Sequence, residues 1–111
     1  MAYSESLAGR LRDVLAGCRN IEAKKMFGGL AFLLDGNMLV GVWHDSLIAR
    51  LGPGQADDAL RRPDVSEFAP AGRPMKGWVL VGPDGVDSDR QLADWVDQAT
   101  GFVRTLPPKA R

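Results

Sequence analysis

The chain has 111 residues, of which 45% are hydrophobic and 25% charged, and this composition is typical of a single globular domain. Lysine and arginine together number 14, as do aspartate and glutamate, so the formal net charge is zero. A neutral chain has no general electrostatic attraction for nucleic acid or an anionic membrane. Binding driven by overall charge is therefore excluded, whereas a local basic patch can still form.

Two features favour a reducing environment away from membranes. Cys18 is the only cysteine, which excludes an intramolecular disulfide. The first residues lack the apolar stretch of a signal peptide, and the longest apolar run, residues 30–34, is far too short to cross a bilayer. We therefore expect a cytoplasmic protein without membrane association.

The chain opens with a predicted amphipathic helix. Ser4 is a favourable N-cap residue for a helix that begins near Glu5, and Gly17 marks its expected end. Apolar residues then recur at helical spacing and form one stripe suited to a core. The stripe consists of Leu7, Leu11, Val14, Leu15 and Cys18.

An Asp35-Gly36 pair between two apolar runs dominates the next segment. Asp-Gly tolerates the positive φ angles of a tight turn, so it predicts a β-hairpin. His44 and Asp45 can turn the chain again, and residues 46–51 then form a third strand, antiparallel to the second. Alternation predicts one continuous apolar face on the hairpin. That face consists of Leu30, Phe32, Leu34, Met38, Val40 and Val42.

The second half of the chain alternates between short elements and turns. Residues 55–62 can form a short helix that ends at Pro63, and residues 65–68 can form a short strand. Two prolines and a glycine make residues 69–74 a loop, after which residues 77–81 form a strand. One helix and two strands thus follow the first three strands.

The last helix has the strongest helical signal. Ser88 and Gln91 have the spacing of a capping box, and Pro107 stops the helix. The resulting order αβββαββα predicts an α+β fold, in which a two-layer antiparallel sheet carries helices on one face within a single domain spanning residues 1–111. The apolar stripe of this helix consists of Leu92, Trp95, Val96, Ala99, Phe102, Val103 and Leu106.

Several separated motifs then point to a known family. The run KMFGGLAF is followed by GNM, IARLGP, GRPMKGWV and finally LPPK. In this order and spacing they resemble the TfoX/Sxy N-terminal domain family, from roughly Tyr3 to Lys109. The motifs occupy residues 25–32, 36–38, 48–53, 72–79 and 106–109.

The resemblance implies a fold similar to type III secretion chaperones, in the order αβββαββα. It also implies a non-enzymatic interaction or regulatory module, related to competence regulators that act with a cyclic-AMP receptor protein at promoters. Those longer regulators carry a second, C-terminal helical domain. Because this chain ends at Arg111, we expect a stand-alone N-terminal domain.

Basic residues form the best candidate binding site. Lys25, Arg73 and Lys76 each lie beside a Gly, Pro or Met at an expected strand start, and Lys24 directly precedes Lys25. If those starts are neighbours, the cations converge and can bind a small anion, nucleic acid or an acidic partner surface. The alternative is ordinary solvated charges paired with nearby carboxylates. Arg50, in the third strand, can either anchor a carboxylate from a buried position or point to solvent.

The sequence shows no catalytic or metal-binding constellation, and we expect neither a cofactor nor enzymatic activity. Asp84, Asp87 and Asp89 do not follow the spacing of a calcium loop and fit turn and cap chemistry instead. His44 is the only histidine, so a zinc site would lack its usual partners. Cys18 lies on the apolar stripe, which favours an inert core thiol.

A sheet covered on one side leaves a second face to account for. We expect this face to carry Leu39, Trp43 and Trp78 and to pair two copies as a symmetric homodimer, because large exposed apolar patches mark partner sites. Trp43, Trp78 and Met75 can equally belong to the core. The alternative to a dimer is that residues 68–74 fold over the face.

Overall fold

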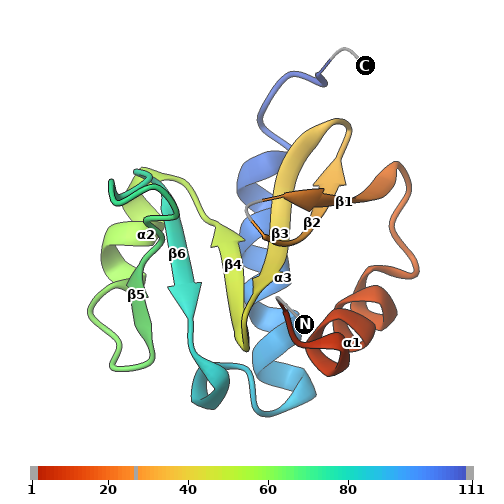
Figure 1. Cartoon of the computed structure of the whole chain (residues 1–111). Coiled ribbons are helices and arrows are strands. Elements are labelled where there is room, and N and C mark those ends of the chain that lie inside the picture. The colour runs from red at the N-terminus through yellow and green to blue at the C-terminus, as the bar shows by residue number, and fades with distance from the viewer. Residues whose placement is uncertain (1–2, 27, 110–111) are drawn as a thin grey trace.

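The computed structural model describes residues 3–26 and 28–109 and has, within them, one six-stranded sheet and three α-helices (Figure 1). A short 3₁₀ turn, η1 (Pro83–Gly85), precedes the last helix. In chain order the main elements are α1 (Glu5–Leu15), β1 (Ile21–Met26), β2 (Gly29–Leu34), β3 (Asn37–Trp43), β4 (Ser46–Arg50), α2 (Pro53–Ala59), β5 (Val65–Glu67), β6 (Trp78–Val81) and α3 (Asp89–Val103).

The sheet has the strand order β1-β2-β3-β4-β6-β5, and every neighbouring pair is antiparallel. This confirms the predicted α+β class. Strand β1 is an addition to the expected order. Its central residues Glu22, Ala23, Lys24 and Lys25 are all exposed. A strand exposed on both faces needs no alternation of apolar residues, and its sequence therefore lacks the pattern that marks a half-buried strand.

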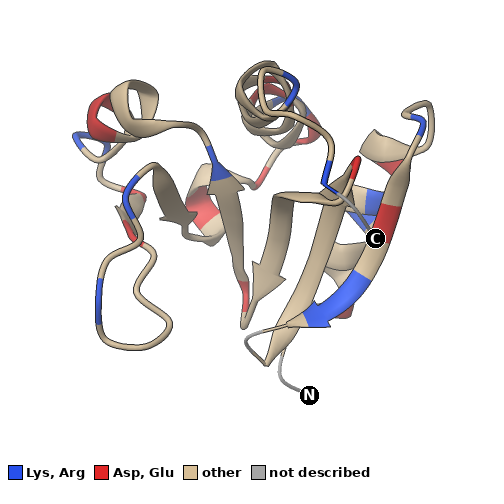
Figure 2. Ribbon diagram, turned by 90° about the horizontal axis from the view of Figure 1, so that it is seen from above, with Lys and Arg blue, Asp and Glu red and all other residues tan. Residues whose placement is uncertain are grey.

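All three helices contribute to one large core on the same side of the sheet. Figure 2 shows α2 and α3 on this side, with the loop between β5 and β6 on the other. The capping box predicted for α3 is present, because Gln91 N donates to Ser88 Oγ (3.1 Å) and Ser88 N donates to Gln91 Oε1 (2.8 Å). Its predicted stripe is buried as expected at Leu92, Trp95, Val96, Ala99 and Val103.

The β2–β3 hairpin turns at Asp35 and Gly36, as predicted, with φ of 52° and 82°. A β-bulge then interrupts the pairing, because Phe32 faces Val40 whereas Leu33 faces Met38. The extra residue reverses the alternation of side chains. Met38 therefore lies on the face away from the helices, and its predicted place beside Val40 is wrong.

The same bulge corrects the expectation for Leu39. The sequence predicts Leu39 on the open face, but its side chain is fully buried in the core beneath the helices. A bulge allows two successive residues to face the same side, which strict alternation cannot do. Leu39 is therefore a core residue and cannot form part of a dimer face.

A membrane-spanning helix is absent from residues 3–26 and 28–109, since none of the helices there has the length and apolarity that crossing requires.

Candidate functional site

The face of the sheet opposite the helices carries a second, smaller hydrophobic cluster with Phe68 at its centre. The Phe68 ring is fully buried. Its centroid lies 6.0 Å from that of Trp43, edge to face, and 6.1 Å from that of Trp78. Two tryptophans from β3 and β6 thus pack against one phenylalanine that the sequence places just beyond a short strand.

Residues 68–77, which we call the covering loop, fold over this face. Met75 N donates a 2.9 Å hydrogen bond to the carbonyl oxygen of Phe68, and this bond closes the loop on itself. The loop thereby seats Phe68 over Ala31 and Ile48, both of which are buried. Residues 68–74 therefore do fold over the open face, as the alternative to the dimer expected.

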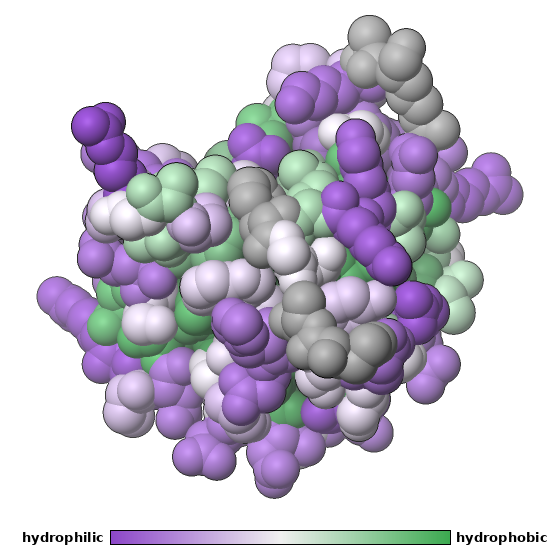
Figure 3. All heavy atoms as spheres, in the orientation of Figure 1, coloured by the Kyte–Doolittle hydropathy of each residue, from purple (hydrophilic) through white to green (hydrophobic). Residues whose placement is uncertain are grey.

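The covering loop leaves an apolar border partly exposed. We call it the open-face patch, and its side chains are half-buried. Seen from the side of Figure 1, hydrophobic atoms lie exposed over β4 and β6 among hydrophilic ones (Figure 3). The expected placement of Trp43 and Trp78 on this side is correct. The patch consists of Met26, Leu33, Trp43, Met75, Trp78 and Leu80.

A hollow of about 210 Å³ adjoins the patch, between α2 and the covering loop. Met75 and Trp78 form part of its apolar wall, while Glu67 and Lys76 lie at its exposed rim. The lining is mixed, because Ala56, Leu60, Met75 and Trp78 lie beside Asp57, Glu67 and Lys76. Such a hollow can receive an apolar side chain from a partner next to a polar group.

Arg50 lies at the end of β4, paired with Trp78 of β6. Its guanidinium carbon is 5.0 Å from the centroid of the Trp78 ring and 5.9 Å from that of Phe102 in α3. The side chain is half-buried, and desolvation by this burial lowers the pKa of the guanidinium. Within the described part of the chain it forms no ion pair. Arg50 is thus a cation positioned by two aromatic rings.

The four other predicted cations do not converge. Lys24 and Lys25 lie on β1, whereas Arg73 and Lys76 lie in the covering loop ahead of β6. Three strands separate β1 from β6, which amounts to roughly 19 Å across the sheet at about 4.8 Å per strand. Figure 2 shows the blue segments of β1 and of the loop at opposite ends of the molecule. The expectation failed because the lysines belong to a separate edge strand.

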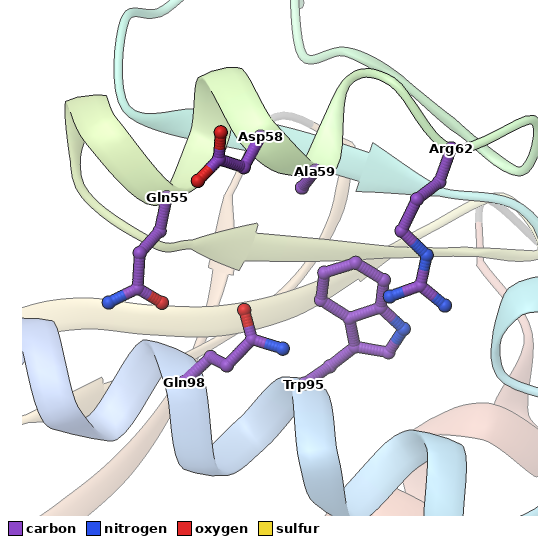
Figure 4. Close-up of a pocket in the computed structure, with 6 residues that line it drawn as sticks. All are labelled: Gln55, Asp58, Ala59, Arg62, Trp95 and Gln98. Atoms are coloured by element: carbon purple, nitrogen blue, oxygen red, sulfur yellow. The ribbon is translucent and has the colours of Figure 1, made fainter.

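A pocket of about 290 Å³ lies between α2 and α3 (Figure 4). Arg62 stacks over the Trp95 ring at 4.6 Å from its centroid, and Trp95 is only 2% exposed. The aromatic face is therefore already covered, and a planar ligand cannot stack on it. The cavity is lined by Gln55, Asp58, Ala59, Arg62, Trp95 and Gln98.

The acidic residues near the start of α3 serve local structure. Asp89 accepts from Arg10 Nε at 3.3 Å, while the backbone carbonyl of Asp87 accepts from the same side chain. Among residues 3–26 and 28–109, no group of three or more His, Cys, Asp or Glu side chains could hold a metal ion. His44 is exposed with its ring 4.7 Å from that of Trp43, and Cys18 is half-buried beside the helix-side core.

Sequence reasoning missed Phe68 as the centre of the site. Its contacts come from residues far along the chain, so no local spacing marks it. The nearest signal in the sequence is the set of large apolar residues Trp43, Met75 and Trp78. Periodicity alone could not decide whether these side chains are exposed or buried.

A family model described as the TfoX N-terminal domain matches residues 13–103, from the last turn of α1 to the end of α3. No curated protein and no solved structure matches the chain.

Proposed function

This chain belongs to the TfoX N-terminal domain family, and on that premise we propose that it is a non-enzymatic, regulatory protein-interaction module. The open-face patch carries the proposal, because it exposes parts of several large apolar side chains on one side of the sheet. Tryptophan and methionine are enriched in protein interfaces relative to the rest of the surface. The patch therefore has the composition of a contact surface for a protein partner.

Packing prepares this surface for binding. Phe68 contacts both Trp43 and Trp78, so the two indoles are held in place before a partner arrives. Ordered side chains lose less conformational entropy on binding. The hollow beside Trp78 can accept an apolar side chain, while Glu67 and Lys76 supply the polar border that interfaces have.

A matched pair of variants tests the role of the patch. The first partner to test is the cyclic-AMP receptor protein of the same organism, since the family resemblance implies regulators that act with it. Leu80→Glu places a charge inside the patch, and Val14→Glu places the same charge at a half-buried position on the helix side. We expect analytical ultracentrifugation to detect a complex whose Kd rises at least about tenfold in Leu80→Glu but not in Val14→Glu.

Two outcomes count against this proposal. If the wild-type chain forms no complex at micromolar concentration, the receptor protein is not the partner. If both variants lose binding equally, the patch is not the surface that binds it. Circular dichroism of each variant controls for loss of the fold.

A cytoplasmic location is part of the proposal. Cys18 is a free thiol, and reducing compartments keep thiols unpaired. Fractionation of cells that express the chain tests this, with recovery in the cytoplasmic fraction as the expected result.

Binding of a small anion or of nucleic acid is a second candidate function, favoured by Arg50. A half-buried guanidinium that contacts two rings and forms no ion pair with a described residue can receive a carboxylate or a phosphate. We expect inorganic phosphate or single-stranded DNA to quench Trp78 fluorescence in a salt-dependent manner, and Arg50→Gln to abolish the effect. Lys24→Gln is the control, because Lys24 lies at the far edge of the sheet.

A further inference from the structure

Strand β1 lies at one edge of the sheet. In the described part of the chain it pairs with β2 alone, from Ile21↔Leu34 to Met26↔Gly29. Its four central residues are exposed, on both faces of the strand. Such an edge presents a row of backbone N–H and C=O groups to which another strand can add.

The register of β1 against β2 decides which backbone groups face outward. Asp35 N donates to the carbonyl oxygen of Asn20 at 3.1 Å, so position 20 directs its backbone groups toward β2. Hydrogen-bonding direction alternates along an antiparallel strand. The even-numbered residues of β1 therefore bond inward, and the odd-numbered residues Ile21, Ala23 and Lys25 direct their N–H and C=O groups to the open edge.

We infer that β1 pairs antiparallel with β1 of a second copy of this chain, about a two-fold axis at Ala23. The two Ala23 residues then exchange N–H···O bonds as a hydrogen-bonded pair. Glu22 of each copy stands opposite Lys24 of the other, which places two pairs of opposite charge across the junction. Lys25 packs its aliphatic stem beside Ile21 of the second copy.

Charge selects this register over its neighbours. An axis at Glu22 would oppose two glutamates, and an axis at Lys24 or Lys25 would oppose two lysines. Like charges directly opposite one another destabilise a strand pair. Registers centred on the ends of β1 would pair almost none of the strand. The lysines that block other registers thus favour pairing at Ala23.

The pairing produces one continuous sheet across both copies, with both helix layers on the same side and both open-face patches on the other. It uses the backbone of β1 and leaves most of the patch uncovered. The inference is therefore independent of the proposed function, since patch variants test partner binding and β1 variants test the mass of the particle.

A cysteine cross-link tests the register directly. In a Cys18→Ser background, Ala23→Cys places two thiols across the axis, with Cα atoms about 5.5 Å apart, within disulfide range. Lys25→Cys is the matched control, because it is equally exposed on the same strand but lies roughly 14 Å from its counterpart in the pair. We expect oxidation to yield a covalent dimer from Ala23→Cys alone. Equal cross-linking of both variants, or of neither, overturns the register.

Charge exchange provides a second test that needs no cysteine. We expect light scattering at low ionic strength to give twice the 12.0 kDa chain mass for the wild type. Glu22→Lys and Lys24→Glu should each fall to the single-chain mass, while an equimolar mixture of the two should recover the double mass, because opposite charges again face each other. A wild-type mass that stays at 12.0 kDa on concentration overturns the inference, as does a dimer that neither substitution weakens.

Discussion

The indole Nε1 of Trp95 donates a 3.0 Å hydrogen bond to the carbonyl oxygen of Gly85, so the largest core side chain has its polar group satisfied. Gly85 lies in η1, just before α3. The bond links the body of the helix to the turn that precedes it. Trp95 therefore stabilises the fold both by packing in the core and by a hydrogen bond.

Trp95→Ala should cost about 3–5 kcal/mol of unfolding free energy, as large aromatic truncations in cores do. Trp95→Phe should cost less, about 1–3 kcal/mol, because it keeps much of the volume but leaves the Gly85 carbonyl without its donor. Urea unfolding followed by circular dichroism measures both. If Trp95→Ala lost less unfolding free energy than Trp95→Phe, the packing described for α3 would be contradicted.

Phe68→Ala should cost a similar amount, about 3–5 kcal/mol, although the residue lies outside the helices and long strands. It removes the ring against which Trp43 and Trp78 pack. Phe102→Ala is the control, because Phe102 is only half-buried and should cost less. Chemical denaturation of both variants tests this, and we expect the lower midpoint for Phe68→Ala. A lower midpoint for Phe102→Ala would mean that the covering loop does not hold Phe68 as described.

The parts of the fold that the sequence predicts are those set by neighbours in the chain. Asp35-Gly36 predicted the hairpin turn, because its chemistry lies in two adjacent residues. Ser88 and Gln91 predicted the start of α3, because a capping box spans only one helical turn. The buried stripe around Trp95 likewise follows from a local helical period.

The features that escaped prediction depend on distant partners. Leu39 faces the helices because a bulge forms against β2, and no residue in its own strand signals it. Strand β1 owes its existence to hydrogen bonds with β2, while Lys24 and Lys25 point into solvent. Phe68 becomes a site residue only when the covering loop reaches Trp43. The sequence did not reveal β1 as a separate edge strand, and for this reason the distance of Lys24 and Lys25 from Arg73 and Lys76 was not predicted.

Gly52 and Gly54 should respond oppositely to alanine. Gly52 has φ of 88°, and an added Cβ would lie 2.5 Å from the Phe102 ring, so Gly52→Ala should cost about 1–3 kcal/mol. Gly54 lies inside α2 with open space around it, so Gly54→Ala should be neutral or stabilise by up to about 1 kcal/mol. Thermal melting of the two variants side by side tests this. Equal destabilisation would show that the loop entering α2 is not positioned as described.

Arg50→Met should leave stability within about 0.5 kcal/mol of the wild type, because two effects oppose each other. The change removes stacking of the cation on Trp78 and Phe102, a contact worth about 0.5–1 kcal/mol at such sites. It also removes the cost of partly desolvating a charge that has no ion pair in the described residues, the same burial that lowers the pKa of Arg50. Methionine keeps the apolar stem in place against both rings. Chemical denaturation at neutral pH provides the measurement, and a loss of 2 kcal/mol or more, roughly what breaking a buried charged hydrogen bond costs, would reveal a structural anion partner for Arg50.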